Sequence, residues 1–212
     1  MEDANTVGGK SFLRVMSRVG KILEREQNFN DRFIEDYSEL HDIVKVLKAM
    51  GKTIVMTGGV YDLLHTGHLR YLAEAKRRGD ILIVSVDTDE ITRKRKGKNR
   101  PVVEQDERVE TLLHSRYVDI ITLRNVPPGQ NDDIEAVVPH VLITSETTKD
   151  FPEVAKQKFA QIGVEVVVLE QQAPSTTTGR IRKLMIDGVE GLVSDIDKVV
   201  RDYLNKIQRG GS

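Results

Sequence analysis

Between about residues 50 and 170, short apolar runs alternate with stretches in which apolar residues recur at helical spacing. The runs predict five strands, at residues 53–56, 81–86, 119–123, 141–144 and 164–169. The spacing between them predicts helices at residues 67–78, 105–114, 132–138 and 152–162. This alternation is typical of βαβ units. We therefore predict an α/β, doubly wound (Rossmann-like) fold with a five-stranded parallel sheet, whose ligand lies beyond the carboxyl ends of the strands.

Both ends of the chain add helices to this pattern. Residues 1–10 are polar, and we expect them to be disordered, while residues 11–27 and 33–47 have helical spacing. These helices either cover the core or pack against another subunit. Residues 196–207 predict an amphipathic helix that follows Gly191 and is capped by Ser194. The predicted divisions are an N-terminal helical extension (1–50), an α/β domain (51–190) and a C-terminal helix with a tail (191–212).

Composition narrows the possible partners. The 212 residues carry 32 basic and 33 acidic side chains, so charge favours neither nucleic acid nor acidic lipid as the main partner. The chain has no cysteine, which excludes disulfides and thiolate metal sites. No apolar run approaches the roughly 20 residues that span a membrane, and no signal peptide is visible. We expect a cytoplasmic protein that binds neither membrane nor nucleic acid and forms a homo-oligomer, such as a dimer.

The first candidate for a functional site is the stretch at residues 57–68, which connects the end of the first strand to the start of a helix. Gly58 and Gly59 let the backbone approach a phosphate closely, because no Cβ stands in the way. The N-terminus of the following helix favours an anion. His65 and His68 lie three apart on the same turn and can donate to phosphate oxygens. A tight turn with two incidental surface histidines is the alternative, but the combination favours a nucleotide-phosphate site.

Two further stretches carry side chains that can contact phosphate groups. Six cations lie within eight positions after the second strand, from Arg93 to Arg100. A charge run is ordinarily a solvated loop, but the carboxyl end of a strand favours phosphate contact. Hydroxyls at Ser175, Thr176, Thr177 and Thr178 precede a helical run, which suits an N-cap combined with phosphate donors.

The segment from Gly59 to His68 resembles the HxGH signature of the nucleotidyltransferase superfamily. That superfamily includes cytidylyltransferases, adenylyltransferases and, more distantly, class I aminoacyl-tRNA synthetases. The resemblance implies that His65 and His68 are catalytic and stabilise charge as pyrophosphate leaves. It implies a catalytic role for Lys96 as well, because the basic stretch is similar to a lysine-bearing loop of the family. Arg93 stands where related enzymes usually carry lysine.

The same resemblance covers the later stretches. Arg108 lies in a helix similar to the family helix whose early arginine reaches the nucleotide, and the hydroxyl run resembles an S-T-T-x motif that begins at either Ser175 or Thr176. Asp62 either contacts the nucleotide or caps the turn or the helix. The nucleotide site implied in this way consists of Gly58, Gly59, Val60, Tyr61, Asp62, Gly67, Asp87, Arg93, Arg108, Ser175, Thr176, Thr177 and Thr178. The sequence offers no metal-ligand cluster, and Mg²⁺ is expected to accompany the triphosphate.

The implied reaction is in-line attack by a phosphorylated small molecule on the α-phosphorus of an NTP. Arg100 and Pro101 resemble the heptose phosphate adenylyltransferases, which favours ATP and a sugar phosphate. Residues 88–90 and 116–119 also resemble CTP-dependent enzymes that act on glycerol phosphate or an amino-alcohol phosphate. Residues 144–150 depart from the family's Lys-Gly-Gly-Asp-like acceptor loop, so the acceptor stays open. A nucleotide-binding sensor without turnover is the alternative of another class.

Overall fold

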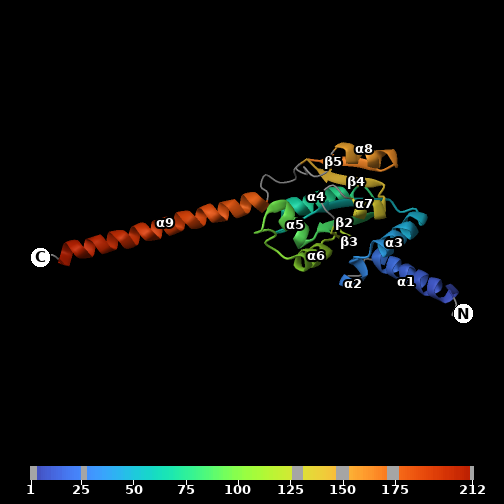
Figure 1. The fold of residues 1–212 in the computed structure, drawn as a ribbon, viewed down its shortest axis with the longest axis horizontal. Helices are drawn as coiled ribbons and strands as arrows, with labels where there is room; N and C mark the ends of the chain where they lie inside the picture. The colour runs from blue at the N-terminus through green and yellow to red at the C-terminus, as the bar shows by residue number, and fades with distance from the viewer. Residues whose placement is uncertain (1–3, 25–27, 126–130, 147–152, 171–176, 211–212) are drawn as a thin grey trace. The chain divides into compact units, whose positions relative to one another are not determined.

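The protein is described by a computed structural model that covers residues 4–24, 28–125, 131–146, 153–170 and 177–210. The chain divides into two compact units, Met1–Ala173 and Pro174–Ser212. The first unit is the α/β part of the chain, and the second contains the helix α9 (Thr177–Gly210) (Figure 1). None of the described helices combines the length and apolar character that crossing a bilayer requires.

The first unit is built on a parallel sheet in the order β3-β2-β1-β4-β5. Its strands are β1 (Ile54–Gly59), β2 (Ile81–Asp87), β3 (Ile120–Arg124), β4 (Val141–Ser145) and β5 (Glu165–Leu169). All five predicted strands and the predicted fold class are confirmed. The chain builds β2 and β3 on one side of β1 and then returns to place β4 on the other. The junction of β1 and β4 is therefore the topological switch point, where ligands of such sheets bind.

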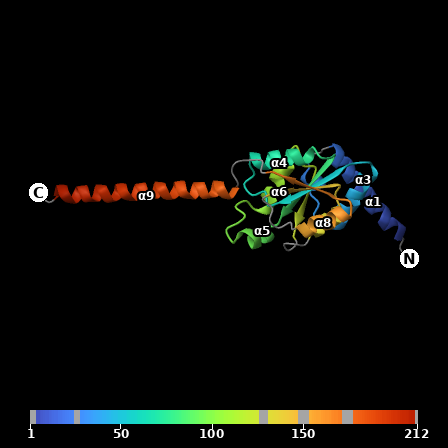
Figure 2. The same cartoon turned by 90° about the horizontal axis from the view of Figure 1, so that it is seen from above.

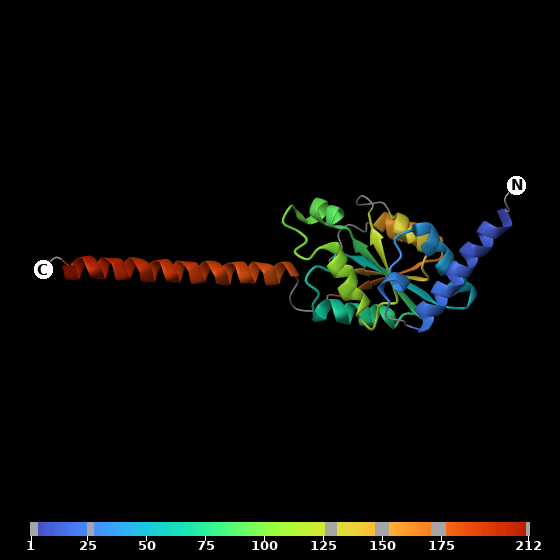
Figure 3. The same cartoon turned by 90° about the horizontal axis from the view of Figure 1, so that it is seen from below.

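Helices cover the two faces of the sheet (Figures 2 and 3). One face packs Leu72 and Val109, which belong to α4 (Thr66–Lys76) and α6 (Gln105–Leu113). The other face packs Val19, Ile43 and Phe159. The helices on that second face are α1 (Ala4–Glu24), α3 (Tyr37–Ala49), α7 (Asp132–Val137) and α8 (Glu153–Gln161). The continuous apolar runs of the central strands follow from this burial on both sides.

The N-terminal segment covers the core. Helix α1 begins at Ala4, so the expectation that residues 1–10 are disordered is wrong from that residue onward. The short helix α2 (Phe29–Arg32) follows, and residues 33–36 are not helical as expected. Instead Phe33 forms a parallel bridge with Ile121 of β3, and Ile34 N–H donates to the Ile121 carbonyl (2.9 Å). This contact shields an edge strand that would otherwise offer unpaired backbone groups.

Two helical predictions need correction. The first half of the basic stretch, Arg93 to Lys96, belongs to the helix α5 (Asp89–Lys96) and not to a loop, whereas residues 97–100 are not helical. The Thr88 hydroxyl caps α5, Glu90 pairs with Lys94, and Gly97 ends it at a φ of 96°. At the other end, α9 is continuous, so Ser194 lies inside a helix and does not cap one. Glycine is tolerated inside a helix at about 1 kcal/mol relative to alanine, and Gly191 therefore does not end it. The domain limits at residues 50 and 190 remain predictions.

Candidate active site

The turn between β1 and α4 is made by residues other than the glycines. Gly58 and Gly59 are the last residues of β1, whereas Tyr61 and Leu63 adopt φ values of 53° and 48°. This left-handed region is uncommon for residues with side chains, and such strain collects at functional sites. The buried ring of Tyr61 lies against Gly59, where an added Cβ would sit 3.2 Å from Cε2 of Tyr61. Gly59 therefore makes room for the Tyr61 ring. This role is separate from the expected one, in which Gly59 lets the backbone approach a phosphate.

The two histidines cap the helix that follows. His65 is the N-cap of α4, and its Nδ1 accepts a hydrogen bond from Gly67 N–H (3.0 Å). His68 Nδ1 accepts from the backbone N–H of His65 (3.4 Å), and the two rings stack with centroids 4.0 Å apart. Because each Nδ1 accepts, each neutral ring carries its proton on Nε2. The structure thus sets two N–H donors side by side at a helix N-terminus, the arrangement that suits oxygens of a phosphate chain.

Asp62 connects the turn between β1 and α4 with the segment that follows α5. We call this turn, residues 60–68, the histidine turn, because it contains His65 and His68. Its carboxylate is 2% exposed and accepts from the backbone N–H groups of Val102 (3.0 Å) and Val103 (3.0 Å). It also pairs with Arg100 at 2.7 Å. These partners give Asp62 a positioning role. The expected contact between Asp62 and a nucleotide stays a prediction.

A second buried carboxylate, Asp87, lies at the end of β2 between two arginines. Arg95 contacts one carboxylate oxygen, and Arg124 contacts the other through Nε (2.6 Å) and Nη2 (2.5 Å). Arg124, the last residue of β3, also lies beside Gly58, where a Cβ would come within 3.5 Å of its Nη1. Sequence reasoning missed Arg124. Its one available signal was its position directly after a predicted strand.

Lys96 belongs to the same charged cluster. Its pKa is lowered, first by desolvation and then by the positive charges of Arg100 and Arg95, while Asp87 and Asp62 act in the opposite direction. The structure therefore brings Lys96 close to both buried carboxylates, one of which belongs to the histidine turn. An anionic ligand here would raise the pKa of Lys96 again, because an opposite charge favours the protonated amine.

Arg108 links the histidine turn to the region after β2. The side chain is 2% exposed, and its Nη1 donates to the carbonyls of Val60 (2.5 Å) and Asp87 (2.9 Å). Its Nε donates to Val103 O (2.9 Å), and its Nη2 pairs with Asp89 (2.6 Å). The guanidinium predicted to reach the nucleotide thus holds Val60 and its neighbours in place.

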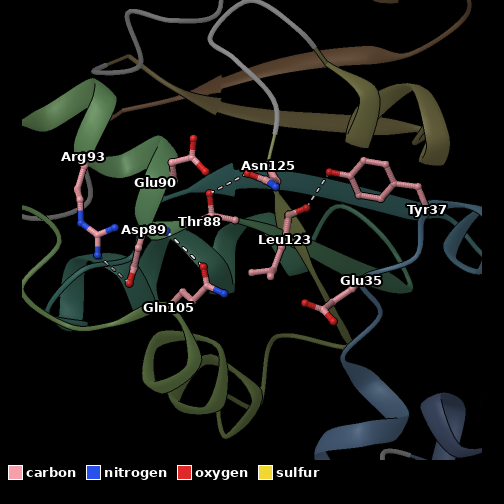
Figure 4. A pocket seen from close by; sticks show the side chains of 9 residues that line it. All are labelled: Glu35, Tyr37, Thr88, Asp89, Glu90, Arg93, Gln105, Leu123 and Asn125. Carbon is pink, nitrogen blue, oxygen red and sulfur yellow. Dashed lines mark hydrogen bonds and ion pairs between the residues drawn. The ribbon is translucent and has the colours of Figure 1, made fainter.

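A pocket of about 590 Å³ opens at the carboxyl ends of β2 and β3. Figure 4 shows residues of α5 on one side of it and Glu35 and Tyr37 on the other. Polar and apolar surface contribute about equally to its lining, and most of the lining side chains carry a polar group: Glu35, Tyr37, Thr88, Asp89, Glu90, Arg93, Gln105, Leu123 and Asn125.

Hydrogen bonds order the pocket's walls. The Tyr37 hydroxyl donates to Leu123 O (2.7 Å), Thr88 Oγ1 donates to Asn125 Oδ1 (3.4 Å), and Asp89 N–H donates to Gln105 Oε1 (3.3 Å). Burial and the charge of Asp133 raise the pKa of Tyr37 to about 12, so its hydroxyl stays protonated at neutral pH. Of these residues, sequence reasoning had placed Arg93 alone in the site, and the structure pairs Arg93 with Asp89 at 3.6 Å.

The hydroxyl run lies largely beyond the described part of the chain. Ser175 and Thr176 lie outside the described residues, and Thr177 and Thr178 are described only as the first residues of α9. A helix was predicted to follow the run, and α9 begins within it, at Thr177. As for the expected Mg²⁺, the described residues contain no group of three His, Asp or Glu side chains arranged to hold a metal ion. The buried carboxylates of Asp62 and Asp87 already pair with arginines.

Two stacked histidines at a strand-to-helix junction of a parallel sheet, with a cationic cluster at the same sheet edge, form the candidate site of a nucleotidyltransferase. The cytidylyltransferase-like family model matches residues 56–186, and the chain belongs to this family. It is 29% identical over 188 residues to the bifunctional protein HldE of Desulfatibacillum aliphaticivorans, covering 85% of this chain and 38% of that protein. The HldE of Hydrogenovibrio crunogenus is 36% identical over 146 residues, covering 69% and 30%.

The chain thus spans less than two-fifths of the length of these relatives. Among solved structures, it is similar to the pantoate-beta-alanine ligase of Francisella tularensis, with a TM-score of 0.50 and 17% identity over 68% of each chain. At that identity the likeness concerns the fold alone. The suspected superfamily is confirmed by the family match.

Proposed function

We propose that this chain transfers AMP from ATP to a phosphorylated small molecule, with a sugar phosphate as the acceptor, and releases pyrophosphate. The observation that carries the proposal is the pair of capping histidines, which present two Nε2–H donors at the N-terminus of α4. An acceptor phosphate oxygen attacks the α-phosphorus, and the bond from that phosphorus to the pyrophosphate oxygen breaks. Negative charge grows on the departing oxygens, where fixed donors lower the barrier most.

The acceptor phosphate is already an anion at neutral pH, so the attack needs no general base. Positioning and charge balance then carry most of the acceleration. We assign the charge balance to Lys96, whose pKa is lowered first by burial and then by the nearby cations Arg100 and Arg95. We assign the backbone contacts of Gly58, Gly59 and Gly67 and the hydroxyls from Ser175 to Thr178 to the nucleotide. Arg108 and Asp87 act as positioning residues. We further propose a cytoplasmic location, consistent with the use of a nucleoside triphosphate.

The pocket beside α5 supports a sugar as the acceptor. Tyr37, Thr88, Gln105 and Asn125 line it with phenol, hydroxyl and amide groups, which exchange hydrogen bonds with sugar hydroxyls. Arg108 connects this pocket to the histidine turn, because it contacts Asp89 in the pocket wall and Val60 in the turn. The similarity of Arg100 and Pro101 to heptose phosphate adenylyltransferases supports ATP.

Pyrophosphate release should be measured with four NTPs against a panel of sugar, glycerol and amino-alcohol phosphates. We expect turnover with ATP and a sugar phosphate. Turnover with CTP and glycerol phosphate would replace the proposed substrates but keep the reaction. Nucleotide binding without turnover for any acceptor would contradict the reaction and indicate a sensor.

The acceptor pocket has its own test. Gln105→Leu removes an amide from the pocket wall and should raise KM for the acceptor about tenfold, the loss of one hydrogen bond, without changing KM for ATP. Gln161→Leu, the same substitution at an exposed position of α8, is the control and should change neither constant. Equal acceptor KM values in both variants would place the acceptor elsewhere.

A further inference from the structure

Helix α9 displays apolar side chains at a strict seven-residue repeat. Large apolar residues occupy the same three positions in two successive heptads, and the first two of these positions recur in the next; every one of these side chains is 49% to 68% exposed. We call this set the apolar stripe; it consists of Met185, Ile186, Val189, Leu192, Val193, Ile196, Val199 and Val200. At 3.6 residues per turn the stripe covers about 140° of the helix surface. Charged residues fill the opposite side.

A seven-residue repeat points to a helical partner. A lone helix turns every 3.6 residues, so a repeat of 3.5 keeps facing a neighbour only when that neighbour is also a helix and the two wind around each other. Three apolar positions per heptad are wider than a two-helix seam and suit the packing of a helix in a bundle. A second copy of α9 offers the same repeat over the same length.

A lipid surface is a poorer match for the stripe. Helices that lie on membranes carry an excess of lysine and arginine on their polar side. In residues 181–201 the charges balance, with Arg182, Lys183, Lys198 and Arg201 against Asp187, Glu190, Asp195 and Asp197. Glu190, Asp195 and Asp197 also flank the stripe by helical position, where an anionic bilayer would repel them.

Among the described residues of the first unit, no helix or strand carries a run of exposed apolar residues of matching length. The unit's described exposed apolar residues that lie near one another in sequence are Phe12, Leu13 and Met16, which span little more than one turn of α1. From Met185 to Val200 the stripe extends for about 22 Å at 1.5 Å per residue.

We propose that the apolar stripe of α9 is a self-association surface through which two or more copies of this chain join. The contact buries the stripe, and it stabilises a helix that two internal glycines, Gly188 and Gly191, would otherwise weaken. The proposal is independent of the reaction proposed above.

Sedimentation equilibrium of the full chain over a hundredfold concentration range tests this surface. The wild-type chain should show at least twice its 23.9 kDa mass, and Leu192→Asp, in the middle of the stripe, should return it to 23.9 kDa. Leu184→Asp is the matched control, because Leu184 is 71% exposed and lies outside the stripe. That variant should associate like the wild type. Followed by circular dichroism, Leu184→Asp should unfold as the wild type does, and Leu192→Asp should lose at most the helical signal of α9.

Three results would overturn the proposal. A wild-type chain that stays at 23.9 kDa at every concentration has no such contact. A Leu192→Asp chain that keeps the wild-type mass associates through another surface. A monomeric wild-type chain that sediments with vesicles of phosphatidylcholine and phosphatidylserine, and loses this binding in Leu192→Asp, uses the stripe on lipid.

Discussion

Replacing Arg108 by methionine should destabilise the protein strongly, because one buried guanidinium serves three backbone carbonyls and a carboxylate. Arg108→Met leaves the carbonyls of Val60, Asp87 and Val103 without this donor and removes the nearer of the two arginine partners of Asp89. Breaking a buried ion pair from one side costs about 3–5 kcal/mol. The Asp89 side chain is 17% exposed and regains some water, so we expect a loss near the lower end, about 3 kcal/mol.

Urea unfolding measures this loss as a fall in the midpoint at an unchanged slope. Arg93→Met is the control, since it removes a guanidinium from the same Asp89. Its side chain is 54% exposed and 3.6 Å from the carboxylate, so we expect less than about 1 kcal/mol. If Arg108→Met lost no more free energy of unfolding than Arg93→Met, Arg108 would not hold the histidine turn in place.

Three further predictions concern charge. KM for ATP should rise as pH rises through the lowered pKa of Lys96, because phosphate binds the protonated amine. In Lys96→Arg, the dependence of this KM on pH should be flatter. Identical pH profiles in the two proteins would show that Lys96 does not bind ATP. Asp62→Asn should cost about 2 kcal/mol in urea unfolding, because Arg100 loses its buried counter-charge; an unchanged midpoint would show that the contact is unimportant.

His140 Nδ1 accepts from Ile54 N–H (2.9 Å), and desolvation and then Lys48 lower its pKa. His140 therefore binds a proton more readily in the unfolded chain than in the folded one. As the pH is lowered below about 6.5, the melting temperature should decrease. The fall should shrink in His140→Gln, and equal falls in both proteins would contradict this linkage.

The sheet was predictable from the sequence because strands buried on both faces are continuous apolar runs. The run Ile81–Asp87 of β2 is buried at every position, and such a run has few readings other than a central strand. The histidine turn was predictable for a related reason: Gly58, Gly59, His65 and His68 are close in sequence as well as in space.

What the sequence did not reveal depends on contacts between distant segments or on weak local signals. Arg124 belongs to the site because it contacts Asp87, and Tyr37 because it donates to the Leu123 carbonyl. In each pair the two residues are far apart in the sequence. The basic stretch was assigned to a loop from its charge, although the Thr88 cap and the Glu90–Lys94 pair are local helix signals. Gly191 was taken as a break, but glycine weakens a helix without always ending it.

Turnover of the two histidine variants tests the central claim most directly. His65→Ala and His68→Ala should each lower kcat for AMP transfer by about 10²–10³-fold, the usual loss when one fixed donor to a transition state is removed. His114→Ala, at the exposed C-cap of α6, is the control and should keep wild-type turnover. Unchanged circular dichroism would show that the fold is intact. Near wild-type turnover of His65→Ala and His68→Ala would contradict the assignment of this turn as the catalytic centre.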